Sequence, residues 1–332
     1  MNMPSQLIDR FNRKITYVRL SVTDRCDFRC VYCMDEKMTF LPRAQLLTLE
    51  ELEWLGRAFV ELGVTKIRLT GGEPLVRKNV LQLVQKLGQL QGLNELVITT
   101  NGSQLVKMAQ PLKEAGVKRI NISLDTLKPE RFQKISRVAK FDAVLSGIEA
   151  AIKAKFTRIK LNTVILKNRN HDEVRNLVQF AVDHGIDISF IEEMPVGVIG
   201  DHDRGEVFYS SDHIRQDIEK LFTLIPTMET TDGPSKYYKV TDTSTRVGFI
   251  SPHTHNFCET CNRVRVTTEG RLLLCLGQEH SIDLRRVIRA HPGEMEPIKQ
   301  AILKAMEMKP KGHDFELSRQ PQILRHMNVT GG

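Results

Sequence analysis

The segment Cys26-Asp27-Phe28-Arg29-Cys30-Val31-Tyr32-Cys33 sets three cysteines at a C-x3-C-x2-C spacing, directly after an expected strand. This spacing is too tight for sensible disulfide pairing among the three cysteines. It suits three thiolates that converge on one iron–sulfur cluster. Because such clusters usually have four cysteine ligands, one iron would stay free for a group that is not protein. A zinc site with a distant fourth ligand is the alternative, and the spacing favours the cluster.

The remaining cysteines, Cys258, Cys261 and Cys275, form a second group of three, so none of the six is left over. His253 and His255 lie near this group, which makes a zinc site with three cysteines and one histidine an alternative. Thiolate ligands need a reducing compartment. The sequence has no secretory apolar segment and no apolar run of membrane-spanning length, so we expect a cytoplasmic protein.

The length of 332 residues suits two domains or one large α/β barrel with an extension. Hydrophobic residues make up 41% and charged residues 27%, so the chain can bury a core. The formal net charge of +8 indicates an anionic partner. Because no run of five or more Lys or Arg occurs, we favour a small polyanion in a cleft over nucleic acid.

Up to about residue 192, expected strands alternate with expected helices, which is typical of a parallel sheet of βα units. The six strands are expected over 16–22, 66–70, 96–100, 119–124, 158–164 and 187–192. Thr48 and Glu51 predict a capping box, and Asn170 predicts a second helix cap.

Beyond about residue 198 the alternation stops. Two strands are expected over 236–240 and 245–250, and a hairpin over 263–275, before helices and a loose tail. We therefore predict two domains, 1–197 and 198–332.

Four of the expected strands have one polar face. These faces carry Arg19 and Ser21, Arg68 and Thr70, Asn121 and Ser123, and Lys160 and Asn162. Strands of an α/β fold are usually apolar on both faces. A polar, basic face therefore indicates a partial barrel whose lumen holds an anionic ligand. A solvent-facing position is the alternative for any single strand.

Two further motifs fit this lumen. The adjacent glycines of Gly71-Gly72-Glu73-Pro74 follow the second strand and let the backbone approach a ligand closely. Arg263 and Arg265 share a strand face beside the second cysteine group, and paired guanidinium forks suit phosphate oxygens. A solvated strand face is the alternative for these arginines.

The cysteine and glycine motifs together resemble the radical S-adenosylmethionine (SAM) superfamily. The whole chain resembles the MoaA-type GTP 3′,8-cyclases of molybdenum cofactor biosynthesis. The matching stretches are Leu20–Cys26, Leu69–Pro74, Thr99–Gly102, Cys258–Arg265 and Gly331-Gly332. The resemblance implies an α/β fold, a partial (β/α)6 radical SAM barrel with a C-terminal α+β extension that carries a second cluster.

The resemblance also implies site residues. Cys26, Cys30 and Cys33 would hold the 4Fe–4S cluster that binds SAM, and Cys258, Cys261 and Cys275 would hold a second 4Fe–4S cluster facing the guanine. Tyr32, Gly72, Ser123 and Met194 would line SAM. Arg19, Arg68, Thr99, Lys160, Arg263, Val264 and Arg265 would bind GTP, and Gly331 and Gly332 would act inside the active site. Ser189 departs from the arginine frequent in relatives, and Val329-Thr330 departs from Tyr-Ile.

The implied reaction turns GTP into (8S)-3′,8-cyclo-7,8-dihydroguanosine 5′-triphosphate. A radical derived from SAM takes the hydrogen from C3′, and C3′ then attacks C8 of the guanine. The cofactors do this chemistry, so no separate catalytic side chain is assigned. The implied partners are a one-electron reductant and, downstream, the cyclic pyranopterin monophosphate synthase.

We expect no nucleic acid or membrane partner, and a monomer or homodimer. A peptide-modifying radical SAM enzyme with auxiliary clusters is one alternative function, and a zinc-binding nucleic-acid module is another.

Overall fold

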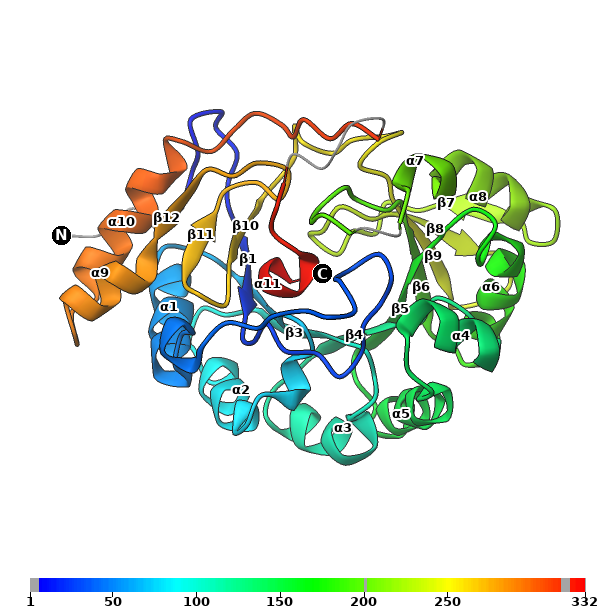
Figure 1. Ribbon diagram of the computed structural model, residues 1–332, viewed down its shortest axis with the longest axis horizontal. Helices are drawn as coiled ribbons and strands as arrows, with labels where there is room; N and C mark the ends of the chain where they lie inside the picture. Colours follow the sequence, from blue (N-terminus) through cyan, green and yellow to red (C-terminus); the bar gives the residue numbers. More distant parts are fainter. Residues whose placement is uncertain (1–5, 200–201, 318–322, 332) are drawn as a thin grey trace.

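One continuous sheet runs through the computed structural model, which describes residues 6–199, 202–317 and 323–331. Its central strands are β1 (Tyr17–Ser21), β2 (Lys66–Thr70), β3 (Glu95–Thr100), β4 (Arg119–Ser123), β5 (Arg158–Val164) and β6 (Asp187–Ile191). Each pairs in parallel with the next, which confirms the predicted parallel sheet of six strands. The sheet curves into a partial barrel (Figure 1).

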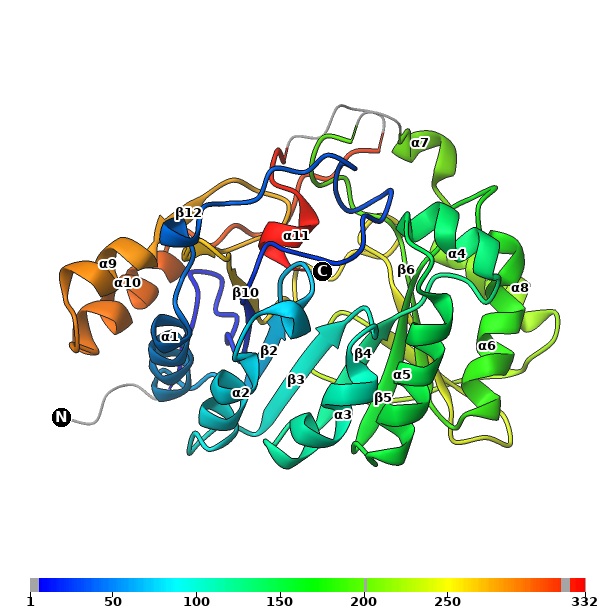
Figure 2. The same ribbon diagram turned by 60° about the horizontal axis from the view of Figure 1, so that its bottom comes forward.

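Helices cover the outer face of the curved sheet (Figures 1 and 2). They are α1 (Leu49–Glu61), α2 (Val80–Gly88), α3 (Leu105–Glu114), α4 (Pro129–Ser136), α5 (Phe141–Lys153) and α6 (Val174–Asp183). The core lies between these helices and the outward strand residues, such as the fully buried Val18 and Leu20. The predicted capping box of α1 is confirmed, since Thr48 Oγ1 accepts from Glu51 N at 3.1 Å and Glu51 Oε2 accepts from Thr48 N at 2.7 Å.

The predicted cap at Asn170 is wrong. A short 3₁₀ helix, η3 (His171–Glu173), precedes α6, and no side chain caps either of them. The Asn170 amide instead accepts from Leu166 N and donates to the carbonyl oxygens of Asp125 and Val164. A buried asparagine can bond any backbone group nearby that has no other partner. Its position just before a helix in the sequence therefore does not by itself identify a cap.

Strands from the C-terminal part extend the same sheet at both edges. β10 (Arg263–Val266) pairs in parallel with β1, and β9 (Arg246–Ile250) pairs in parallel with β6. The antiparallel strands β11 (Arg271–Leu273), β12 (Ser281–Asp283), β8 (Lys236–Val240) and β7 (Leu224–Pro226) follow outward. The division at residue 197 stays a prediction, and the sheet is continuous across it.

The remaining described elements flank the barrel or enter it. They are α7 (Arg204–Val207), α8 (Ser211–Glu219), α9 (Leu284–Ala290), α10 (Glu296–Met306), α11 (Met327–Thr330), η1 (Arg43–Gln45) and η2 (Pro74–Val76). The expectation of a loose tail is wrong for α11, which lies over the lumen (Figure 1). Asn328 of α11 is buried, and its Nδ2 donates to Asp24 O at 2.8 Å. Within the described ranges, no helix has the length and apolar composition needed to cross a membrane.

Candidate active site

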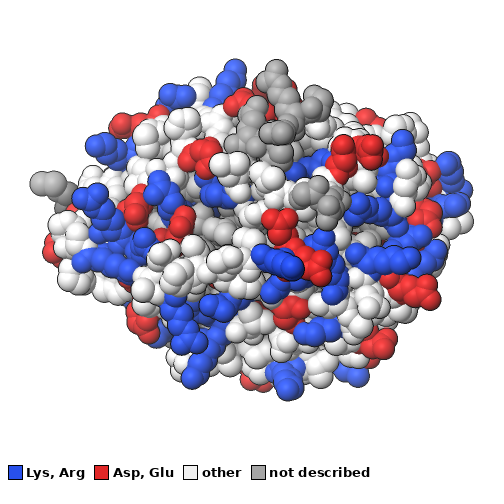
Figure 3. All heavy atoms as spheres, viewed as in Figure 1, with Lys and Arg blue, Asp and Glu red and all other residues white. Residues whose placement is uncertain are grey.

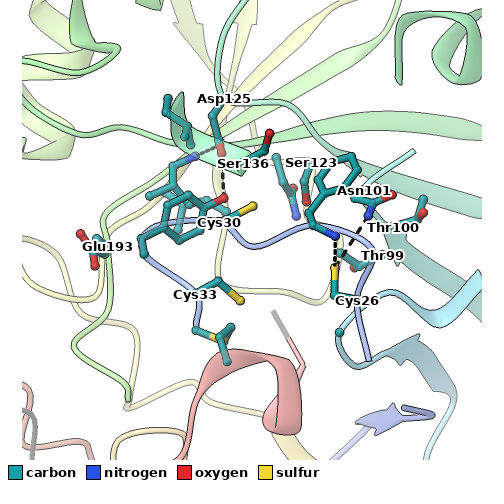
Figure 4. A pocket seen from close by; sticks show the side chains of 18 of the residues that line it. Cys26, Cys30, Cys33, Thr99, Thr100, Asn101, Ser123, Asp125, Ser136 and Glu193 are labelled. Atoms are coloured by element: carbon teal, nitrogen blue, oxygen red, sulfur yellow. Dashed lines mark hydrogen bonds between the residues drawn. The ribbon is translucent and has the colours of Figure 1, made fainter. Parts of the chain in front are cut away.

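A cavity lies at the carboxyl ends of the parallel strands, the usual ligand position in such sheets. Its lining includes Cys26, Cys30, Cys33, Tyr32, Gly72, Ser123, Met194 and Thr99. These are the first cysteine group, the four residues expected at SAM, and one residue expected at GTP. Figure 4 shows the three thiols on one loop, close to the strand ends that carry Ser123 and Asp125.

The glycine motif packs directly on the backbone that leads into the cysteine loop. Gly72 N donates to Thr23 O at 2.7 Å. A Cβ atom on Gly71 would lie 2.2 Å from Thr23 O, and one on Gly72 would lie 2.4 Å from Arg25 O. The glycines are therefore required for contact between two loops, a role that the sequence did not reveal.

Glu73 organises the neighbouring strand ends. Its fully buried carboxylate accepts from Leu75 N at 2.9 Å, Thr100 Oγ1 at 2.8 Å and Asn101 N at 2.6 Å. Burial raises the pKa of Glu73 to about 7, against the effect of these donors. Asn101 Nδ2 lies 3.8 Å from Cys26 Sγ (Figure 4). Neither Glu73 nor Asn101 was predicted as a positioning residue, although each follows the end of a strand.

Asp125 supports the loop from the opposite side. Tyr32 Oη donates to Asp125 Oδ2 at 2.7 Å, and Val164 N donates to Asp125 Oδ1 at 2.9 Å. Burial raises the pKa of Asp125 to about 6. The carboxylate thus fixes the aromatic ring that precedes Cys33.

A second cavity lies deeper in the lumen. It is lined by Cys258, Cys261 and Cys275 together with Arg19, Arg68, Asn121, Lys160, Arg263, Val264 and Arg265. The prediction that the polar strand faces line a lumen is confirmed for Arg19, Arg68, Asn121 and Lys160. Asn162, Ile191, Met194 and Met327 line both cavities, so the cavities meet there.

Positive charge is concentrated in this second cavity. Burial and the neighbouring Arg265 lower the pKa of Arg19, and burial lowers the pKa of Lys160. Burial opposes ionisation of Tyr17, but Arg68, Arg19 and other cations outweigh it and lower the pKa of Tyr17 to about 7. Crowded buried cations gain stability from an anion, so the cavity fits a polyphosphate.

Two of the basic side chains that line this cavity, Arg68 and Lys160, also have polar partners. Arg68 Nη1 donates to Thr99 Oγ1 at 2.7 Å, and Arg68 Nε donates to Tyr17 Oη. Lys160 Nζ donates to Tyr237 Oη at 3.1 Å. These bonds hold the cationic groups in fixed positions before any ligand arrives.

The cysteines fit iron–sulfur ligation in their chemistry. All six are free thiols that are partly buried. Burial raises the pKa of Cys26 to about 12, whereas Arg263 and Lys309 outweigh burial and lower the pKa of Cys261 to about 7. Lys309 Nζ lies 3.8 Å from Cys261 Sγ and donates to Leu274 O at 2.6 Å. Lys309 was not predicted as a neighbour of the cysteines, because only the fold brings it to them.

The departure at Ser189 leaves no charged group at that position. Ser189 is fully buried, and its Oγ lies 3.1 Å from Ser235 Oγ. A Cβ atom on Gly248 would lie 2.6 Å from Ser189 Oγ and 2.2 Å from Ser235 Oγ. The backbone at Gly248 therefore packs closely against these two serines.

Gly331 lies inside the lumen. It is buried with a φ of +77°, and a Cβ atom there would lie 2.2 Å from Thr70 Cγ2. Its backbone oxygen accepts a hydrogen bond from Arg265. Gly332, expected beside it, lies outside the described residues.

The face of the molecule shown in Figure 3 differs from the second cavity in its charge pattern. On the face shown in Figure 3, Lys and Arg are spread widely and Asp and Glu lie among them. Arg68 and Lys160, which line the second cavity, are buried and are not part of this surface charge.

Comparisons with known proteins agree with this architecture. Residues 20–181 match the model of the Radical SAM superfamily, and residues 186–315 match the model described as Molybdenum Cofactor Synthesis C. A GTP 3′,8-cyclase of Saccharophagus degradans is 59% identical over 328 residues, and one of Pseudomonas entomophila is 58% identical over 330 residues. Both alignments cover 99% of each chain.

The crystal structure of Streptococcus suis SuiB is similar in fold. The match has a TM-score of 0.62 at 13% sequence identity, and it covers 96% of this chain and 78% of that one. At this identity the likeness concerns the fold alone.

Proposed function

Since the chain belongs to the GTP 3′,8-cyclase family of the radical SAM superfamily, we propose that its two connected cavities form one active site for SAM and GTP. The enzyme converts GTP to (8S)-3′,8-cyclo-7,8-dihydroguanosine 5′-triphosphate in molybdenum cofactor biosynthesis. It is a lyase that uses 4Fe–4S clusters and SAM. The observation that carries the site assignment is that each cavity holds one cysteine group and that the two cavities share residues.

In the first cavity, Cys26, Cys30 and Cys33 would hold the cluster that binds SAM. When bound, the reduced cluster and SAM supply the radical chemistry. The chain's own part is to orient SAM, through Tyr32, Gly72, Ser123 and Met194. The bond from Tyr32 to Asp125 supports this role, because it fixes one wall of the cavity.

In the second cavity, Cys258, Cys261 and Cys275 would hold the second cluster, next to the guanine. Arg19, Arg68, Thr99, Lys160 and the segment Arg263–Arg265 would bind GTP. Guanidinium and ammonium groups are the usual partners of phosphate oxygens. The Arg68–Thr99 bond links this basic group to the first cavity, so a nucleotide held here would extend toward SAM.

Two expectations outside the site complete the proposal. The reaction uses a one-electron reductant, and its product would pass to the cyclic pyranopterin monophosphate synthase. We also propose a cytoplasmic location, because thiolate ligands survive in a reducing compartment.

Anaerobic turnover tests the function directly. Reconstituted protein with SAM, GTP and dithionite should give the cyclised nucleotide and 5′-deoxyadenosine in parallel, measured by mass spectrometry. ATP in place of GTP serves as the control substrate and should give no cyclised product. Cleavage of SAM without any consumption of GTP would refute the assignment of GTP as substrate.

A further inference from the structure

Asn121 occupies the border between the two cavities. It lies in the middle of β4, where its register neighbours are Thr99 on β3 and Lys160 on β5. The side chain is 1% exposed and lines the second cavity. Ser123, on the same strand face two residues later, lines the first cavity. On the polar face of β4, Asn121 is therefore the last residue that lines the second cavity, and Ser123 already lines the first cavity, where SAM is proposed to bind.

The amide of Asn121 has only one of its two ends engaged. Nδ2 donates to Asn162 Oδ1 at 3.4 Å, and Asn162 lines both cavities. Oδ1 is buried and has no hydrogen-bond partner among the described residues. Buried polar atoms are nearly always bonded, and an unbonded one costs stability. The oxygen is thus a free acceptor in a cavity built for a ligand.

The charges around Asn121 limit which group of a ligand can donate a hydrogen bond to Oδ1. Arg19, Arg68 and Lys160 present donors to the same cavity. Phosphate oxygens are acceptors and would bond these cations, so they cannot satisfy Asn121. The donors of a guanosine nucleotide are its ribose hydroxyls and the N–H groups of the base. The acceptor therefore faces either the sugar or the base.

The position of Asn121 favours the sugar. This step rests on the proposed function, in which the hydrogen at C3′ must lie against the SAM side. The ribose then lies at the border of the cavities, and the base lies farther in, near the second cysteine group. We propose that Asn121 Oδ1 accepts a hydrogen bond from a ribose hydroxyl of GTP and so holds C3′ toward the first cavity.

Binding of deoxynucleotides tests this contact. Dissociation constants of GTP, 2′-deoxyGTP and 3′-deoxyGTP are measured for the reconstituted wild type and for Asn121→Leu, Asn121→Asp and Asn94→Leu variants. The wild type should bind one deoxy analogue about tenfold more weakly than GTP, the size of one hydrogen bond. Asn121→Leu should bind GTP and that analogue equally. Asn121→Asp keeps an acceptor oxygen and should keep the preference, as should the exposed control Asn94→Leu.

For each variant, the dissociation constant of the deoxy analogue is divided by that of GTP. A substitution that weakens the binding of all nucleotides equally leaves this ratio unchanged. Iron content and SAM binding are measured on the same samples, and an Asn121→Ala variant, which also lacks an acceptor, replaces Asn121→Leu if leucine prevents cluster assembly. A second readout is the coupling of SAM cleavage to GTP cyclisation. Asn121→Leu should raise the amount of 5′-deoxyadenosine formed per cyclised product at saturating GTP, because C3′ is held less well toward the first cavity.

Two results would overturn the contact. One is equal binding of all three nucleotides by the wild type, and the other is an unchanged preference in Asn121→Leu, or in Asn121→Ala where that variant replaces it. Either result would leave the cyclase assignment intact as long as the wild type cyclises GTP. Failure of the wild type to bind GTP at all would instead refute the proposed function.

Discussion

Arg265 Nη1 donates a hydrogen bond of 2.5 Å to the backbone oxygen of Gly331. Arg265 belongs to β10, and Gly331 follows α11, so the bond ties the C-terminal segment to the strand beside the second cysteine group. Gly331 also lies against Ser21 and Thr70 at the ends of β1 and β2. The segment after α11 is thus part of the lumen wall.

Deletion of Gly331 and Gly332 should leave folding, both clusters and SAM binding nearly intact. Cyclised product should fall by orders of magnitude, because Arg265 loses the partner that holds its guanidinium. Anaerobic turnover of GTP by truncated and full-length protein measures the effect. Equal product yields would show that the tail has no part in the reaction.

A single substitution tests the same segment without shortening it. Gly331→Ala should also reduce cyclisation, because its Cβ would meet Thr70 Cγ2 and because φ is +77°. Adding Thr70→Ser removes that methyl group and should restore part of the activity. No recovery would assign the defect to the backbone angle or to the remaining close contacts with Ser21 Oγ and the hydroxyl oxygen at position 70.

The two cysteine groups should hold separate clusters. Replacing Cys26, Cys30 and Cys33 together with Ala should roughly halve the iron and sulfide content and abolish SAM cleavage, as ligand counting requires. Replacing Cys258, Cys261 and Cys275 should also halve the iron content but leave SAM bound. Anaerobic metal analysis measures both, and zinc in place of iron in the wild type would refute cluster binding.

Arg263→Ala should weaken GTP binding and leave both clusters in place. Loss of one charge-assisted hydrogen bond corresponds to about 2–3 kcal/mol. Arg271→Ala on the adjacent β11 is the matched control, because Arg271 bonds Ser281 and does not line the second cavity. Titration with GTP measures both variants, and an unchanged affinity in Arg263→Ala would remove its phosphate role.

Stability should depend on pH through Glu73. Its pKa is raised to about 7 in the folded protein, whereas an unfolded glutamate has a pKa of about 4.3. The unfolded state therefore loses its proton first as pH rises. The contribution of Glu73 to the free energy of unfolding should drop by about 1 kcal/mol from pH 6 to pH 8. Anaerobic urea unfolding of wild type and Glu73→Gln isolates this contribution, because the other titrating groups are common to both, and the wild type should lose about 1 kcal/mol more than the variant over this range.

Much of the barrel could be predicted because its signals are local. Alternating strands and helices, the capping box at Thr48 and the polar strand faces all lie within short windows, and the structure has them as expected. The cysteine spacings likewise identify a site without knowledge of the fold. The lining of the first cavity includes every residue that the resemblance placed at SAM.

What could not be predicted depends on contacts between distant segments. Lys309 reaches Cys261, and Asn328 reaches Asp24, only because the chain returns to the lumen. The continuation of the sheet by β9 and β10 could not be predicted either, because the residues of a strand do not identify the distant strand with which it pairs. The predicted helix cap at Asn170 was wrong because its amide donates to the distant Asp125 O and does not bond the helix that follows it.

The pairing of β10 with β1 has a consequence for how the protein reaches this structure. Asn262, just before β10, bonds Thr16, just before β1, although the two are 246 positions apart. During synthesis one edge of β1 must therefore wait, unpaired, until most of the chain has been made. Such an edge is open to association with other chains, and distant pairing slows folding. Early folding intermediates of this protein should thus be the species that aggregate, and chaperones that cover strand edges should raise its yield.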